Sequence, residues 1–127
     1  NYADLSGINF EGEGGIGLDA YCLVLLTDCN FTGWDTAAVS QNGAWVNAME
    51  CTFANNTVGL KFSTTMAYGT APNYVNNTFA DNGTAVCIDS LPGNEVIDFA
   101  GSVFSGNDTD IDNKADHAVD TAKATFE

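Results

Sequence analysis

One aromatic residue recurs along this chain at nearly constant spacing. Six of its eight phenylalanines are separated by 21, 22, 26, 25 and 22 residues: Phe10, Phe31, Phe53, Phe79, Phe104 and Phe126. Self-similarity with a period of about 20 to 50 residues is typical of proteins built from stacked structural repeats. The spacing therefore predicts one repeat for each of these phenylalanines.

The residues that follow these phenylalanines also align between repeats. An asparagine stands three residues after the phenylalanine in three repeats, as Asn56, Asn82 and Asn107. Apolar residues then alternate with other residues: Val58, Leu60 and Phe62 in one repeat, and Val86 and Ile88 after Thr84 in the next. An alternation of period two is typical of β-strands.

Repeats of this length, with short strands and no helical period, cannot bury an apolar face alone and must stack on one another. Parallel strands stack about 4.8 Å apart, which would place the phenylalanines in one internal column. We therefore expect an all-β fold, a right-handed parallel β-helix of about five to six coils. Residues 1–127 would form this single domain.

The pattern Asn-x-Phe-x-x-Asn-x-x-Gly/Ala-Val/Ile resembles the β-helix repeats of the pectate-lyase-like superfamily and covers nearly the whole chain. Members of that superfamily include polysaccharide lyases, glycoside hydrolases, epimerases, phage tailspikes and non-catalytic surface proteins. The resemblance implies the coiled architecture without selecting one activity. Because Phe126 leaves its coil unfinished, we expect a segment of a longer solenoid whose open coil ends can self-associate.

The charge of the chain excludes two classes of partner. It has 3 Lys and Arg residues together against 17 Asp and Glu, for a net charge of −14, which would repel nucleic acid and anionic lipid. The longest apolar run, residues 23–26, is too short to cross a membrane. We expect an extracellular or cell-surface protein. Its five Asn-x-Ser/Thr tripeptides fit glycosylation there, or arise from the repeat itself.

The four cysteines occupy two kinds of position. Cys29 and Cys51 each stand two residues before a phenylalanine, in a column that Asn77 and Ser102 continue. In the superfamily this column faces inward, so the two cysteines are either buried free thiols or a disulfide between adjacent coils. Cys22 and Cys87, in contrast, have no aligned partner and are expected to stay reduced.

Three carboxylates alternate along one predicted strand, as Asp108, Asp110 and Asp112. They would project from one face, and such a face is a candidate calcium site. The alternative is a solvated strand without metal, because the spacing lacks the glycine and the distal glutamate of an EF-hand loop.

Two neighbouring repeats are longer than the others because of insertions at residues 63–74 and 90–95. Insertions in a solenoid lie in loops on one face, which is often the binding face. The side chains expected to line it are Tyr68, Asn73, Tyr74, Asn94 and Glu95, with Lys61 at its foot. Aromatic, amide and carboxylate groups together commonly hold a sugar, whereas plain turn insertions are the alternative.

Trp34 lies in the second coil, and Trp45 lies in the segment that follows. Trp34 replaces the asparagine of the turn, so it either extends an aromatic surface or packs locally. Trp45 lies in an apolar strand and is expected in the core.

No catalytic constellation emerges from these residues. The chain has no Arg, its single His117 is expected in a solvated loop, and stacking would bring Asp89 near Asp112 as a carboxylate pair. We therefore expect a non-catalytic, adhesin-like extracellular module that binds a carbohydrate or a surface protein. The alternatives are a carbohydrate-active enzyme of the pectate-lyase-like fold and a fibre or tailspike segment.

Overall fold

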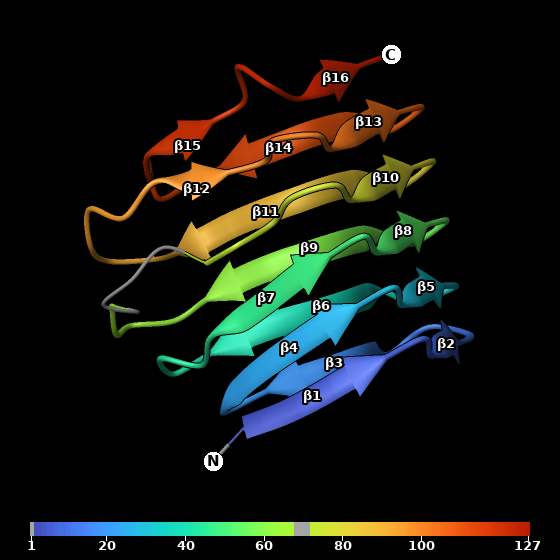
Figure 1. Cartoon of the computed structure of the whole chain (residues 1–127), viewed down its shortest axis with the longest axis horizontal. Coiled ribbons are helices and arrows are strands. Elements are labelled where there is room, and N and C mark those ends of the chain that lie inside the picture. The colour runs from blue at the N-terminus through green and yellow to red at the C-terminus, as the bar shows by residue number, and fades with distance from the viewer. Residues whose placement is uncertain (1, 68–71) are drawn as a thin grey trace.

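The computed structural model describes residues 2–67 and 72–127, and all the regular secondary structure in these ranges is β-strand. The chain climbs from the N-terminus to the C-terminus in successive coils (Figure 1). Strands at equivalent places in neighbouring coils pair in parallel. The predicted all-β parallel β-helix is therefore confirmed.

The paired strands form the faces of the coil. The first sheet contains β1 (Tyr2–Ser6), β4 (Leu23–Thr27) and β7 (Val46–Met49). The second contains β2 (Asn9–Glu11), β5 (Asn30–Thr32), β8 (Thr52–Ala54), β10 (Thr78–Ala80), β13 (Val103–Ser105) and β16 (Thr125–Phe126). The third contains β3 (Ile16–Ala20), β6 (Thr36–Gln41), β9 (Val58–Ser63), β11 (Thr84–Ser90) and β14 (Thr109–Asn113). A fourth contains β12 (Ile97–Asp98) and β15 (Val119–Asp120).

The fourth sheet continues the face that the first sheet begins. The Ala48 amide of β7 donates to the carbonyl of Asn73, and Asn73 forms a parallel bridge with Asp98 of β12. Each complete coil therefore has three faces, which meet at three corners.

The six repeated phenylalanines form one stack inside the coil. Successive ring centroids are 4.4, 5.1, 5.2, 4.8 and 4.8 Å apart, and the ring planes differ by at most 12°. The four central rings are buried, whereas Phe10 is half-buried and Phe126 is 48 % exposed. The predicted column of Phe10, Phe31, Phe53, Phe79 and Phe104 is confirmed.

Left-handed residues lie at all three corners, and at two of them they recur from coil to coil. At the first corner, between the first and second sheets, they are Gly7, Asp28, Glu50, Asn76 and Gly101; at the second corner, between the second and third sheets, they are Gly33, Asn55, Asp81 and Gly106. Most are Gly, Asn or Asp, the residues that adopt positive φ most readily. At Gly33 a Cβ would also lie only 2.1 Å from the carbonyl oxygen of Gly12.

The asparagines of the second corner form a hydrogen-bonded ladder. The side chains of Asn56, Asn82 and Asn107 each donate to the carbonyl oxygen of the phenylalanine one coil earlier, over 2.9 to 3.1 Å. The Oδ1 atoms of Asn82 and Asn107 accept the backbone amide of the asparagine below them. Trp34 occupies this position in the second coil, and its indole Nε1–H donates to the Phe10 carbonyl over 3.0 Å.

The cysteine column at the first corner also faces inward. Cys29, Cys51, Asn77 and Ser102 are all buried. The Cys51 amide donates to Asn77 Oδ1, and the Asn77 amide donates to Ser102 Oγ, over 2.9 and 3.1 Å. All four cysteines of the chain are free thiols, so the structure shows no disulfide between Cys29 and Cys51.

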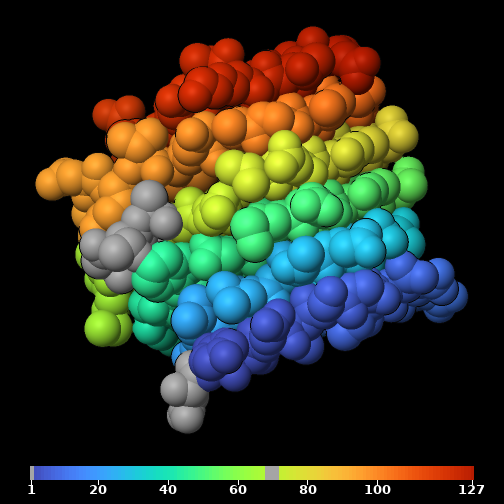
Figure 2. All heavy atoms as spheres, viewed as in Figure 1, coloured from blue at the N-terminus to red at the C-terminus, as the bar shows by residue number. Residues whose placement is uncertain are grey.

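The third corner, after the third sheet, carries the loops of variable length. The Thr64 amide donates to the Ser90 carbonyl, and Ser90 Oγ donates to the Thr64 carbonyl, so the two longest loops start side by side. The coils form stacked layers in Figure 2, and segments of the third corner protrude at its left edge. The loops therefore extend outward from a regular scaffold.

The phenylalanine stack predicts a large cost for truncation. Replacing Phe79 with Ala should lower the free energy of unfolding by about 3 to 5 kcal/mol, because it leaves a cavity between two stacked rings. Urea denaturation followed by circular dichroism measures the change. A loss below about 1 kcal/mol would contradict a packed column.

The asparagine ladder predicts a separate cost. Replacing Asn82 with Ala leaves the Asn56 amide and the Phe53 carbonyl without partners inside the coil, and should cost about 2 to 4 kcal/mol. Asn55→Gly is the matched control, because Asn55 is exposed and glycine tolerates its positive φ. Equal stability of the two variants would show that the ladder contributes nothing.

Candidate functional site

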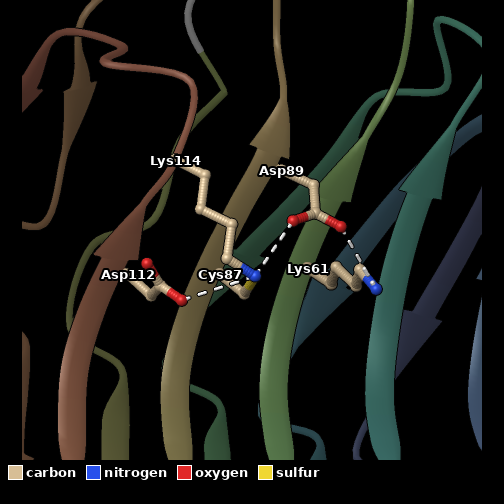
Figure 3. A network of polar contacts seen from close by, with 5 residues as sticks. All are labelled: Lys61, Cys87, Asp89, Asp112 and Lys114. Atoms are coloured by element: carbon tan, nitrogen blue, oxygen red, sulfur yellow. Dashed lines mark hydrogen bonds and ion pairs between the residues drawn. The ribbon is translucent and has the colours of Figure 1, made fainter.

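A network of ion pairs lies on the outer surface of β9, β11 and β14 (Figure 3). Asp89 Oδ2 lies 3.4 Å from Lys61 Nζ, and Asp89 Oδ1 lies 3.4 Å from Lys114 Nζ. Lys114 Nζ also lies 3.6 Å from Asp112 Oδ2. Two of the three lysines of the chain therefore meet on this surface.

Strand register and one irregularity place these residues together. Cys87 is the register partner of Lys61 on β9 and of Asp112 on β14, so the three project outward in one row. The pairing of β11 with β9 shifts register between Ile88 and Ser90, which places Asp89 at the irregularity. Such a bulge turns a side chain away from the regular row, and here Asp89 lies between both lysines.

The network fixes the charge state of its central carboxylate. Partial burial alone would raise the pKa of Asp89, but the hydrogen bond from Lys114 and the positive charges of Lys61 and Lys114 outweigh burial and hold that pKa below its usual range. The pKa of Lys114 is raised by the negative charge that Cys87 carries whenever its thiol is ionised, and by the carboxylates of Asp89 and Asp112. Exposed ion pairs of this kind contribute little to stability.

Cys87 lies at the centre of the row but is a poor nucleophile. Its side chain is 6 % exposed, and Sγ lies 3.8 Å from Asp89 Oδ1. Burial, and then the charge of Asp89, raise the pKa of the Cys87 thiol. Reactive cysteines have a lowered pKa, so this thiol stays protonated and unreactive.

The structure disperses the ligand-binding residues predicted from the sequence. Lys61 projects outward beside Cys87, next to the start of the loops, as predicted. Asn94 is exposed and Glu95 is half-buried in the 90–95 loop. Asn73 is exposed on a different face, where it bridges to β12. Tyr68 lies outside the described residues.

Tyr74 belongs to the core and not to the expected surface. Its side chain is 0 % exposed, and its hydroxyl donates to the Val46 carbonyl. Its ring packs 5.5 Å from Phe62 and 5.9 Å from Phe99. An inward-facing place in the coil holds the ring, so Tyr74 cannot stack on a ligand at the surface.

The predicted calcium ligands do not converge. Asp108 is exposed in a turn, Asp110 accepts a hydrogen bond from Asn107, and Asp112 pairs with Lys114. The three side chains thus have different surroundings, although alternate residues of a strand share one face. Within residues 2–67 and 72–127, no group of three or more His, Cys, Asp or Glu side chains is placed to hold a metal ion.

His117 is buried, so the prediction of a solvated loop histidine is wrong. Nδ1 faces the Leu91 carbonyl at 3.0 Å, and Nε2 faces the Glu95 carbonyl at 2.6 Å. The Asn113 side chain also accepts from the His117 amide and donates to the His117 carbonyl. His117 therefore connects β14 to the 90–95 loop, a role that no sequence pattern indicated.

Two shallow depressions adjoin at Trp34 on the second corner. One, of about 430 Å³, is lined by Gly33, Trp34, Asp35, Asn55, Asn56, Thr57, Asp81 and Gly83. The other, of about 590 Å³, is lined by Glu11, Gly12, Glu13 and Trp34. Trp34 is thus both a member of the ladder and a wall of both depressions.

Comparison with known proteins finds no matching family model, no matching curated protein and no matching solved structure. The β-helix fold is therefore established by the structure itself. Among the described residues, no helix is long and apolar enough to span a membrane.

The buried thiol of Cys51 predicts a loss of stability at alkaline pH. Burial raises the pKa of this thiol from 9.0 to about 11. The folded state then holds a proton that the unfolded chain releases, so stability is full below about pH 9 and falls as the pH rises toward 11. The contribution is on the order of 2 kcal/mol.

Thermal melts of the wild type and of Cys51→Ala at about pH 8 and about pH 10.5 measure this loss. Other groups titrate in the same range, so the difference between the two proteins isolates the thiol. The wild type should lose more stability than the variant. Equal losses would mean that the Cys51 thiol is not buried.

Proposed function

We propose that this chain is a non-catalytic module of a secreted or cell-surface protein and that it binds another protein. The surface that carries the proposal consists of Lys61, Met66, Asp89, Asn94, Val96 and Lys114, named here the loop face. The coil pattern Asn-x-Phe-x-x-Asn and the parallel β-helix support placing the chain beside the pectate-lyase-like proteins.

The observation that carries the proposal is the exposure of apolar side chains in the lengthened loops. Met66 is 59 % exposed and Val96 is 45 % exposed. The loops that hold them contact one another, since a Cβ at Gly93 would lie 3.3 Å from Cβ of Ala67. Apolar side chains with a charged rim are typical of a protein interface, and methionine is enriched there.

The loop face suits a protein better than a sugar. Sugar sites usually offer an aromatic ring for stacking, but Tyr74 is buried. Lys61 and Lys114 already pair with Asp89 and Asp112, so the local surface is nearly balanced in charge. The net charge of −14 would steer a partner with a basic surface toward the chain.

The lowered pKa of Asp89 argues against this residue as the general acid of a hydrolase. Asp89 and Asp112 share Lys114, as their predicted proximity suggested. A glycosidase needs one carboxyl group with a raised pKa to act as the general acid, but the pKa of Asp89 is lowered. The lysines keep Asp89 ionised, which supports a structural and recognition role.

The proposal predicts which substitutions abolish binding. The purified chain should bind at least one member of an array of extracellular-matrix and cell-surface proteins, and Met66→Ser/Asn94→Ala should weaken that binding at least about tenfold. Ile16→Ser is the matched control, because Ile16 is 49 % exposed on β3, away from the loops.

Biolayer interferometry measures the affinities, and circular dichroism checks the fold of each variant. Binding should also weaken as salt is raised, because the attraction is partly electrostatic. A partner bound equally by the double variant, or an array that yields no protein partner, would contradict the proposal.

A further inference from the structure

The Trp34 side chain is held in one orientation by three contacts of the first coil. Its indole Nε1–H donates to the Phe10 carbonyl over 3.0 Å. The ring lies against Gly12 and Gly17, where an added Cβ would come within 2.5 and 3.0 Å of ring atoms. Glycine at both positions lets the ring lie directly on the backbone, so the indole is ordered before any ligand arrives.

The ladder does not require a side chain of this size. At the same position Asn56, Asn82 and Asn107 supply the donor to the phenylalanine carbonyl. The indole makes the same hydrogen bond and adds a large aromatic surface. That surface is only partly buried, and it borders a depression of about 430 Å³ and another of about 590 Å³.

Polar side chains from the second corner of neighbouring coils lie around the ring. Asp35, Asn55, Thr57 and Asp81 are exposed and line the first depression. Asp35 accepts from the Gly15 amide over 2.8 Å. The side chains of Asn55 and Asp81 make no hydrogen bond within the part of the chain that the structure describes, so they are available to hydroxyl groups.

The turn itself does not need the side chains of Asn55 and Asp81. Both occupy the left-handed position of the second corner, with φ of 60° and 56°. Glycine fills the same position in other coils, as Gly33 and Gly106, with φ of 86° and 70°. The two side chains can therefore be removed without changing the backbone.

The local charge selects the class of ligand. Glu11, Glu13, Asp35 and Asp81 line the depressions, and no lysine does. Anionic sugars such as uronates would be repelled. Neutral hydroxyl groups, in contrast, can donate to carboxylates and amide oxygens.

We propose that Trp34, Asp35, Asn55, Thr57 and Asp81, named here the tryptophan turn face, bind a neutral oligosaccharide. One pyranose ring packs on the indole, and its neighbours donate hydroxyl hydrogen bonds to Asn55 and Asp81. The depressions are open and within the usual range of ligand-site volumes, which suits a chain of several sugar units. The loop face lies at the third corner, at the opposite ends of the third-sheet strands, so this inference does not depend on it.

Two variants test the site while keeping the fold. Trp34→Asn restores the ladder residue of the other coils and removes the indole. Asn55→Gly/Asp81→Gly removes two polar side chains at positions that accept glycine. Asn76→Gly is the matched control, because Asn76 is exposed, has φ of 59° and lies at the first corner, where Gly7 and Gly101 are its equivalents.

The probes are cellohexaose, xylohexaose and mannohexaose, with an oligogalacturonate as the anionic comparison. The protein is produced in a bacterial host so that Asn55 carries no glycan. Calorimetry and tryptophan fluorescence should show that at least one neutral hexasaccharide binds the wild type with a Kd below about 1 mM. Trp34→Asn should weaken that binding at least about tenfold, the double glycine variant about threefold or more, and Asn76→Gly not at all.

The inference is overturned if no neutral hexasaccharide binds below about 1 mM, if the oligogalacturonate binds more tightly, or if folded Trp34→Asn binds as the wild type does. If Trp34→Asn fails to fold, unchanged binding by the double glycine variant overturns the inference instead. Loss of oligosaccharide binding with unchanged protein binding at the loop face would separate the two sites.

Discussion

Inward-facing residues of this chain pack against their equivalents in the neighbouring coils. That constraint explains why phenylalanine recurs, since each ring of the stack lies 4.4 to 5.2 Å from the next. It also explains the polar columns inside the coil. An asparagine such as Asn82 can be buried because Asn56 below it and Asn107 above it supply its partners.

Departures from the repeat are where this chain gains surface beyond what the coil requires. Trp34 keeps the hydrogen bond of the ladder and adds an aromatic ring at the second corner. Asp89 lies at a register shift and joins Lys61 to Lys114. The lengthened loops expose Met66 and Val96 at the third corner. Both proposed binding surfaces therefore include residues that break the pattern around them.

The sequence predicted most of the features that repeat and missed some that lie in or beside single loops. The phenylalanine column and the outward position of Lys61 follow from the coil alignment, because equivalent residues share one environment. The inward position of Cys29 and Cys51 was implied by the resemblance to the pectate-lyase-like repeats. The burial of Tyr74 was also encoded in the repeat, because Tyr74 stands five residues before Phe79 as the buried Ala48 and Phe99 stand before Phe53 and Phe104. The burial of His117 depends on how its loop returns to the coil, which no periodicity encodes. Asp110 and Asp112 take different partners, Asn107 and Lys114, which strand periodicity alone does not indicate.

The central claim is that the internal ladders hold the coils together, and native-state amide hydrogen exchange measured by NMR tests it most directly. The amides of Cys51, Asn56, Asn77 and Asn82 donate to ladder side chains. The account predicts that they exchange only through global unfolding, with the free energy that denaturation gives, while amides of the 90–95 loop exchange faster. Ladder amides that exchange as fast as those of the loop would contradict it.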